Sequence, residues 1–383
     1  MKRVGSLLLR GVIAVVGTAL VSTASAQVDP LAPLPDQPLR PVAPPQAPQS
    51  VTQIQPQPSY ARQAASSGFE AYKTRLAYIA RAGGIRDATI AAVVPYLRVS
   101  NTAIRLDRSG QPGNVGNTSY TPPFEPYRRR HVSADLIRRG QSRYSSLWPW
   151  LSRVEQRTGV PASIMMAIYG HETSYGAVTG NFDIIDALAS LAWEGRRRAL
   201  FEREFVSALK LLDMGIPRWR LKGSYAGATG YPQFMPSSVI RLRVDGDGDG
   251  KAEIWSSQVD GLASIGNYLK DAGWKAGVPW GIAVQVPAGL DRNAVRNLTT
   301  PTECPRVHVR HSRPLTMAQW RALGVRPYGR ALPDGETATL LEPDGQDRTA
   351  YLLTGNYQAI LKYNCSNFYA LSVGLLANAI VGR

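Results

Sequence analysis

Glu172 is the side chain whose type and spacing best suit acid–base chemistry. Ile164, Ile168 and Glu172 are four residues apart, so they lie on nearly the same face of a helix. The carboxyl therefore ends an otherwise apolar stripe, where desolvation favours its protonated form. A carboxylic acid that keeps its proton near neutral pH can act as a general acid. The spacing alone also allows a glutamate at a frayed helix end that faces water.

His171 and Glu172 also begin the His-Glu-x-x-His pattern of zinc proteases. That motif needs a second histidine at position 175, which is Tyr175, so it fails. His308 and His311 have no third ligand type nearby, and we interpret them as structural or surface residues. The chain contains neither a Gly-x-Ser-x-Gly motif nor a phosphate-binding loop, which argues against an esterase or a kinase.

Residues 223–238 are small and glycine-rich. Three glycines and two alanines would let the backbone approach a ligand closely. The segment also offers flat rings and polar groups, a mixture that suits sugars: Tyr225, Tyr231, Phe234, Ser224 and Gln233. A tight helix–loop–helix corner packed on itself has the same composition, so both interpretations stay open.

An acidic loop follows, with Asp245, Asp247 and Asp249 at alternate positions. This pattern matches the first half of a calcium loop, and Gly250 permits the sharp turn. The twelfth position is Ser256 rather than glutamate, so a closing carboxylate would come from Glu253 or from the later Asp260. We predict a structural cation site with these ligands: Asp245, Asp247, Asp249, Lys251 and Asp260. The alternative is an acidic turn without a metal.

The first 26 residues have the pattern of a secretory signal peptide. Basic residues flank an apolar run at 12–21, and Ala24-Ser25-Ala26 forms a cleavage site. No cysteine follows the run, so we expect a soluble exported protein without a lipid anchor. Residues 27–67 are expected to form a disordered linker, because 27–60 contain ten prolines and few large apolar side chains.

Charge and cysteines narrow the partners and the compartment. The formal net charge of +16 falls to about +13 without the three basic residues of the signal peptide. Export argues against nucleic acid and favours anionic partners of the cell envelope. Cys304 and Cys365 are the two cysteines, and we expect them to pair in an oxidising compartment. Two thiols that never meet are the alternative.

Hydrophobic spacing predicts helices over most of the remaining chain. Apolar side chains recur at helical spacing from Phe69 onward, and Ser133 has the character of a helix cap. Between 283 and 353 the pattern changes to short strand-like pieces, which include Val307 and Val309. We therefore expect a mainly α protein with a small mixed insertion.

Four blocks, in this order, resemble the lytic murein transglycosylase B family. They are residues 169–176, 186–192, 223–238 and 363–370, with the acidic loop between the third and fourth. The resemblance runs from about residue 68 to the C-terminus. It implies a lysozyme-like helical core at about 145–280 and 354–383, an additional helical region at about 68–144 and a small α/β insertion at about 281–353.

The resemblance also implies the site. The family's catalytic glutamate corresponds to Glu172, and its acidic EF-hand-like loop corresponds to the loop above, with a departure in the spacing to Asp260. The substrate-contacting positions correspond to Tyr127, Arg197, Arg198, Ser224, Gln233, Tyr268, Tyr363, Asn364 and Tyr369. The expected enzyme is a periplasmic monomer that acts on peptidoglycan glycan strands without a catalytic cofactor. Proteins of cell-wall synthesis or remodelling are candidate partners.

One acid is enough for the reaction that the resemblance implies. Glu172 would protonate the oxygen between N-acetylmuramic acid and N-acetylglucosamine. It would then accept the proton of the muramoyl C6 hydroxyl, which attacks C1 and closes a 1,6-anhydro ring. Two alternatives remain open: a lysozyme-like hydrolase that admits water, and a wall-binding protein without turnover.

Overall fold

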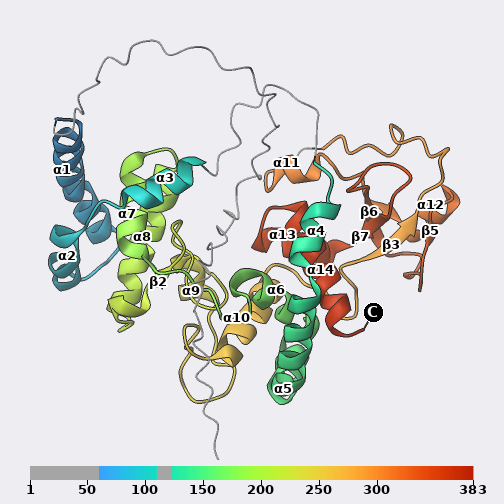
Figure 1. Cartoon of the computed structure of the whole chain (residues 1–383), viewed down its shortest axis with the longest axis horizontal. Coiled ribbons are helices and arrows are strands. Elements are labelled where there is room, and N and C mark those ends of the chain that lie inside the picture. Colours follow the sequence, from blue (N-terminus) through green and yellow to red (C-terminus); the bar gives the residue numbers. More distant parts are fainter. Residues whose placement is uncertain (1–59, 110–121, 300, 383) are drawn as a thin grey trace, which may run out of the picture.

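The computed structural model describes residues 60–109, 122–299 and 301–382, with side chains from residue 68 onward (Figure 1). The expected signal peptide and residues 27–59 of the expected linker lie outside the described residues. The first helix begins at Tyr60, so residues 60–67 of the expected linker are helical. The described chain is mainly α, as predicted, and its elements form two helical lobes and one small sheet.

The first lobe contains helices from two separate parts of the chain. Its members are α1 (Tyr60–Ala82), α2 (Asp87–Val93), η1 (Val94–Tyr96), α3 (Asn101–Ser109), α7 (Ile184–Glu194), α8 (Arg198–Asp213), η2 (Arg218–Arg220) and α9 (Pro236–Leu242). A two-stranded ribbon, β1 (Phe182–Asp183) and β2 (Lys222–Gly223), leads into and out of it. The apolar stripe of Phe69, Tyr72 and Leu76 on α1 packs into the same cluster as α7 and α8.

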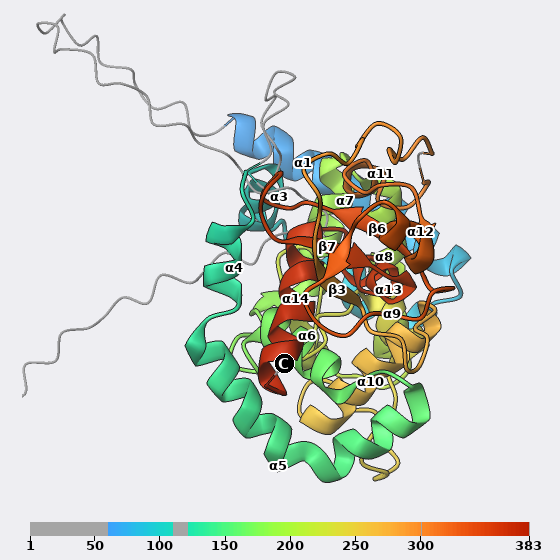
Figure 2. The same cartoon turned by 90° about the vertical axis from the view of Figure 1, so that its right-hand side faces the viewer.

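The second lobe surrounds a buried central helix. Its members are α4 (Glu125–His131), α5 (Ala134–Thr158), α6 (Ala162–Thr173), α10 (Gln258–Asp271), α13 (Gly355–Tyr363) and α14 (Asn367–Ile380). Helix α6 is apolar on all sides, as expected of a helix buried in a core. It contacts α5, α10 and α14, and Figure 2 shows α14 running alongside it. The predicted cap is present: Ser133 Oγ accepts from the Leu136 amide at 3.3 Å and begins α5.

The lobes divide the chain differently from the sequence-based boundaries. We placed α7 and α8 in the core, but their apolar faces pack with α1 and α2 in the first lobe. We placed α4 in the N-terminal helical region, but Phe124 and Tyr127 pack in the core of the second lobe. Periodicity identifies an apolar face and cannot show which neighbour covers it. The sequence therefore assigned α7 and α8 to the core and α4 to the N-terminal helical region, which is the reverse of how they pack.

The insertion is a five-stranded antiparallel sheet in the order β4-β6-β7-β3-β5. Its elements are β3 (Gly281–Gln285), α11 (Pro305–His308), β4 (Leu315–Thr316), α12 (Met317–Ala322), β5 (Arg326–Pro327), β6 (Thr337–Leu341) and β7 (Ala350–Leu353). The first and last strands are paired, with Gly281 opposite Leu353. The strand predicted at Val307 is wrong, because Pro305 begins a short helix there.

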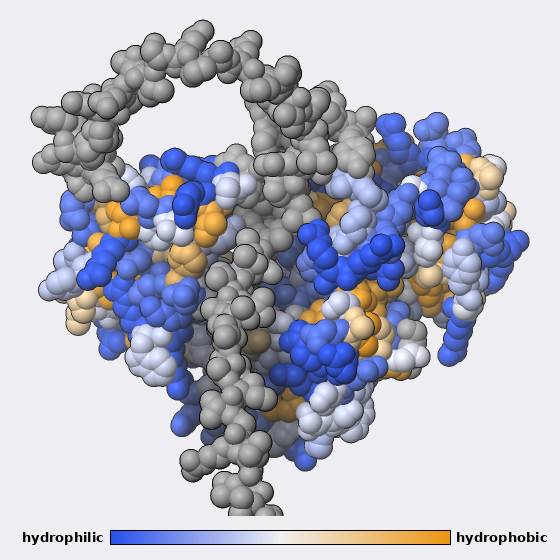
Figure 3. Space-filling view, viewed as in Figure 1, coloured by the Kyte–Doolittle hydropathy of each residue, from blue (hydrophilic) through white to orange (hydrophobic). Residues whose placement is uncertain are grey.

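A disulfide joins the insertion to the second lobe. Cys304, which precedes α11, is bonded to Cys365, which lies between α13 and α14, and the two Cα atoms are 5.6 Å apart. Their side chains therefore connect segments that are separated by 61 positions in the sequence. Among the residues that Figure 3 colours, hydrophilic side chains make up most of the visible surface, with smaller hydrophobic patches between them. In the described part of the chain, no helix combines the length and apolar character needed to cross a membrane.

Gly374 lets α14 pack directly against Trp280, just before β3. A Cβ at this position would lie 2.3 Å from Cε2 of Trp280, which is itself buried. We expect Gly374→Ala to lower the free energy of unfolding by about 1–3 kcal/mol because of overpacking, although alanine normally favours a helix. Gly355→Ala is the matched control, since no atom lies within 4 Å of its added Cβ. Urea unfolding of both variants tests this, and equal stabilities would contradict it.

Candidate active site

Glu172 is the second-last residue of α6 and stands where that buried helix ends. The chain turns sharply there, because Ser174, Tyr175 and Gly176 all have positive φ angles of 51°, 60° and 85°. The guanidinium of Arg139 on α5 donates to the carbonyl and hydroxyl oxygens of Ser174 at 3.2 and 3.0 Å. The carboxyl is thereby held at a fixed point beside the core.

The Glu172 carboxyl is half-buried and hydrogen-bonded to a phenol. The Tyr369 hydroxyl donates to Oε1 at 2.7 Å. Burial raises the pKa of Glu172 to about 7, against the smaller lowering effect of the Tyr369 hydrogen bond. Near neutral pH the carboxyl is therefore close to half protonated, which suits a group that first gives and then takes a proton.

Two further phenols lie within range of the Glu172 charge. Burial, and then that charge, raise the pKa of Tyr127 and of Tyr363 above the ordinary value of a phenol. The same two causes raise the pKa of Tyr369. The three tyrosines come from α4, α13 and α14, so three separate elements converge on one carboxyl. All three phenols stay neutral across the physiological range.

A stack of rings beside Glu172 was not predicted from the sequence. The ring of His131 lies 3.7 Å from that of Tyr127, the ring of His171 lies 6.0 Å from His131, and Tyr369 lies 5.6 Å from His171. Burial, and then the neighbouring His131, lower the pKa of His171 to about 3, so this ring is neutral. The available signal was the spacing of four between Tyr127 and His131 on one helix.

Tyr268 and Tyr363 form a second aromatic pair at the site's edge, with ring centroids 4.7 Å apart. The Tyr268 hydroxyl donates to the Lys362 carbonyl at 2.6 Å, and that of Tyr363 donates to the Pro232 carbonyl. The first hydroxyl therefore joins α10 to α13, and the second joins α13 to the glycine-rich segment. Asn364 follows, and among the described residues its buried Oδ1 accepts no hydrogen bond.

The glycine-rich segment is folded tightly on itself. The Ala228 amide donates to Ser224 Oγ at 3.0 Å, and Gln233 Nε2 donates to the Gly230 and Thr179 carbonyls. Tyr225 and Phe234 are buried, so they do not offer the open flat faces that their types suggested. Gly223 is required, since an added Cβ would lie 1.9 Å from the Ala228 carbonyl oxygen.

Arg197 and Arg198 are held in the first lobe. Arg197 pairs with the buried Asp107 and its guanidinium lies 4.8 Å from the centre of the Phe201 ring. Arg198 donates to the Ala192 carbonyl and lies over Tyr72. These contacts bind α8 to α1, α3 and α7, whereas the phenols around Glu172 belong to the second lobe.

The acidic loop gathers three carboxylates. One oxygen each from Asp245, Asp247 and Asp249 lies within 4.8 Å of the other two, a spacing that could hold one hard cation. Asp260 is buried and its two oxygens accept from the Gly246 and Glu253 amides at 2.8 and 2.7 Å, so it fastens the loop to α10. The Lys251 amide donates to Asp249.

Similarity to known proteins identifies the family of this chain. Residues 68–378 match the family described as the transglycosylase SLT domain. The chain is 33% identical over 272 residues to the membrane-bound lytic murein transglycosylase B of Escherichia coli K12, covering 69% of this chain and 70% of that protein. The chain belongs to the lytic murein transglycosylase B family. This transglycosylase also resembles several solved structures.

The similar structures share its fold over most of their length. SltB3 of Pseudomonas aeruginosa, in complex with NAG-NAM-pentapeptide, superposes with a TM-score of 0.72 and 37% identity, covering 82% of this chain and 80% of that one. SltB1 of the same organism gives 0.66 and 29%, with coverages of 84% and 98%. Slt35 of Escherichia coli, in complex with calcium, gives 0.63 and 27%, with coverages of 83% and 92%.

Burial of Glu172 makes stability depend on pH. Its folded pKa of about 7 lies above the ordinary 4.5, so its stabilising contribution is present below pH 4.5 and is lost as pH rises through 7. Glu172→Gln should therefore match the parent near pH 4 and exceed its unfolding free energy near pH 8.5, by on the order of 3 kcal/mol. Urea unfolding at both pH values checks this. A difference that does not change with pH would contradict the burial of this charge.

Proposed function

We propose that Glu172 is the single acid and base with which this lytic transglycosylase cleaves the bond between N-acetylmuramic acid and N-acetylglucosamine in peptidoglycan. The observation that carries the proposal is a half-buried carboxyl with a pKa of about 7 that accepts a hydrogen bond from Tyr369. It is poised between its two protonation states at the pH where the reaction must run.

The reaction needs one proton to move twice. Protonated Glu172 gives its proton to the glycosidic oxygen as the bond from that oxygen to the muramoyl C1 breaks. The N-acetyl group of the same sugar stabilises the positive charge that develops at C1. The Glu172 carboxylate then takes the proton of the C6 hydroxyl while that oxygen bonds to C1. The product is a 1,6-anhydro end, and no water is consumed.

Tyr369 stabilises Glu172 in its charged carboxylate state. Its hydroxyl donates to Oε1, so the bond strengthens when Glu172 becomes a carboxylate. Its own pKa lies well above that of an ordinary phenol, so it does not compete for the proton. The neutral rings of His131 and His171 line the same wall and add no positive charge that would lower the pKa of the acid.

The predicted substrate-contacting residues differ in whether their polar atoms are already bonded within the protein. Asn364 Oδ1, which has no hydrogen-bond partner in the described part of the chain, is the strongest candidate for binding a sugar hydroxyl or amide. Tyr127, Tyr363 and Tyr369 present rings near the reacting carboxyl. For Ser224, Gln233 and Tyr268 we propose a supporting role, because their polar atoms already bind the protein. Arg197 and Arg198 are the weakest candidates, since contacts in the first lobe hold both.

The similar structures support this choice of substrate and product. SltB3 has been seen with NAG-NAM-pentapeptide and with NAG-anhNAM-pentapeptide. For this chain we propose the same glycan chemistry, carried out in the periplasm after removal of residues 1–26. The Slt35 complex with calcium likewise supports calcium at Asp245, Asp247 and Asp249, where it would stabilise the loop rather than take part in the reaction.

Glu172→Gln should lower turnover of purified sacculi by roughly 10²- to 10⁴-fold, because an amide keeps the shape of the side chain but cannot give a proton. Mass analysis of products from the parent should show 1,6-anhydromuramic ends, one water lighter than hydrolysis products. Glu70→Gln is the matched control, an exposed glutamate on α1 whose loss should leave turnover unchanged. Substantial cleavage by Glu172→Gln would refute the role, and mainly reducing muramic ends would favour a hydrolase.

Calcium should raise the melting temperature of the parent, and a chelator should lower it, because an ion that binds the folded state stabilises it by mass action. The double variant Asp245→Asn/Asp247→Asn should lose this response. Asp334→Asn is the control, an exposed aspartate that is paired with Arg321 in the insertion. Melting temperatures that are the same with calcium and with chelator would argue for an acidic turn without a metal.

A further inference from the structure

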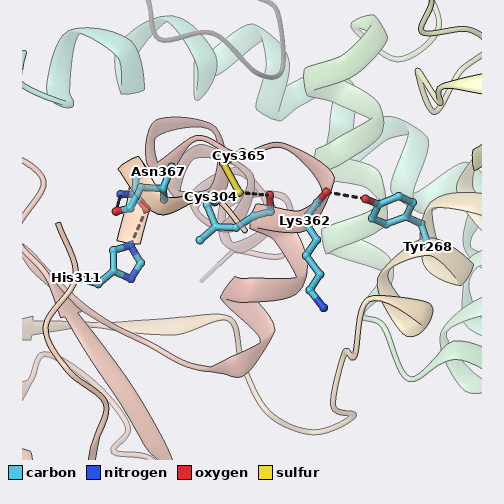
Figure 4. Close-up of a disulfide and its surroundings, with 8 residues drawn as sticks. Tyr268, Cys304, His311, Lys362, Cys365 and Asn367 are labelled. Carbon is cyan, nitrogen blue, oxygen red and sulfur yellow. Dashed lines mark hydrogen bonds between the residues drawn. A yellow bond between two sulfur atoms is a disulfide. The ribbon is translucent and has the colours of Figure 1, made fainter. Parts of the chain in front are cut away.

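Several bonds hold the start of α14 to the insertion, and Figure 4 shows two of them side by side. The first is the disulfide between Cys304 and Cys365. The second is a hydrogen bond of 2.8 Å between His311 Nε2 and Asn367 Oδ1. We name these four residues the clamp. It joins the loop around α11 to the short junction between α13 and α14.

Both polar atoms of the Asn367 amide bind the insertion, and its Oδ1 also accepts from the Tyr357 hydroxyl of α13 at 3.2 Å. Its Oδ1 accepts from His311, and its Nδ2 donates to the Val307 carbonyl at 3.2 Å. His311 is buried, and burial lowers its pKa to about 4, so the ring is neutral and carries its proton on the nitrogen that faces Asn367. Its other nitrogen accepts from the Thr339 hydroxyl on β6. The clamp is thus built into the sheet rather than into a loose loop.

The clamped junction leads directly to the reacting carboxyl. Ser366 lies between the two clamp residues and caps α14, since its Oγ accepts from the Tyr369 amide at 3.3 Å. Tyr369 stands in the first turn of that helix and donates its hydroxyl to Glu172. On the other side of Cys365 lies Asn364, whose buried Oδ1 accepts no hydrogen bond from any residue that the structure describes. A shift of this junction would therefore move both groups relative to Glu172.

We propose that the clamp positions Tyr369 and Asn364 toward Glu172, so that the inserted sheet acts as a rigid back support of the active site. Cys304, Cys365, His311 and Asn367 are in this sense positioning residues, although none of them contacts the carboxyl. The inference rests on the proposed role of Glu172. If the clamp only stabilised the fold, its removal would lower the melting temperature. The kcat/KM and pH profile of the remaining folded enzyme would then stay unchanged.

The experiment compares the parent, Cys304→Ser/Cys365→Ser, Tyr369→Phe and the triple variant. Removing the clamp bond should lower kcat/KM on the order of 10- to 100-fold, as misplaced catalytic groups do. It should also move the basic limb of the pH profile upward, because the Tyr369 hydrogen bond that lowers the pKa of Glu172 is weakened. In the Tyr369→Phe background, serine replacement should leave that limb where it is.

Val284→Ala is the matched control, because it removes buried volume from the sheet's own core without touching the clamp. At a similar loss of melting temperature, it should keep the kcat/KM and pH profile of the parent. If the serine variant does not fold, His311→Gln and phosphine-reduced parent enzyme replace it in the same comparison. Three results would overturn the inference. The basic limb of the pH profile could stay unshifted in the serine variant, or it could shift equally in the Tyr369→Phe background. Val284→Ala could also lose as much kcat/KM as the serine variant. Activity retained by Glu172→Gln would instead overturn the proposed function.

Discussion

The burial of one carboxyl at the end of a core helix is the constraint on which this structure depends. Helix α6 is covered by α5, α10 and α14, so its last turn delivers Glu172 to the edge of the core and not to open solvent. Desolvation there raises the pKa of Glu172 to about 7 and costs stability whenever the group is charged. The apolar packing of Met165, Met166 and Ile168 around the same helix offsets that cost.

Several of the described groups around the carboxyl are polar and uncharged. Tyr127, Tyr363 and Tyr369 supply phenols, and the buried His171 ring stays neutral. A positive side chain hydrogen-bonded to Glu172 would lower its pKa and remove the proton that the first step requires. Arg139, the arginine on α5 next to this turn, instead forms an ion pair with Asp135 and donates a hydrogen bond to Ser174. Neutral donors can stabilise the carboxylate formed in mid-reaction without preventing its protonation.

The sequence was informative where a feature is local. The apolar spacing around Glu172, the cap at Ser133 and the alternating aspartates from Asp245 to Asp249 each follow from residues a few positions apart. It also predicted the bond between Cys304 and Cys365, but it failed at other places where distant segments meet. Nothing in the pattern of α7 shows that α1 rather than α6 covers it, and nothing near His131 shows that His171 lies beside it. Val307 was assigned to a strand because two valines two positions apart share one face of a strand, but so short a pattern does not distinguish a strand from the helical turn that Pro305 begins.

The architecture of the insertion explains why a clamp is needed. The sheet enters and leaves the second lobe through paired strands, with Gly281 opposite Leu353 and the Thr354 amide donating to the Trp280 carbonyl at 3.1 Å. Two adjacent strands form a narrow attachment about which a sheet could swing. A further attachment is made by Asp344, whose carboxylate accepts from the Phe124 and Glu125 amides at 2.6 and 3.1 Å. Cys304 and His311 lie in a different part of the insertion, so bonds from them to Cys365 and Asn367 add another point of attachment. In the chain-entropy model a disulfide that closes so long a loop stabilises by roughly 4 kcal/mol. That gain would be similar at many other places, but here the attachment falls on Cys365, next to Asn364, and on Asn367, two residues before Tyr369. A support at this place restrains the wall of the active site as well as the sheet.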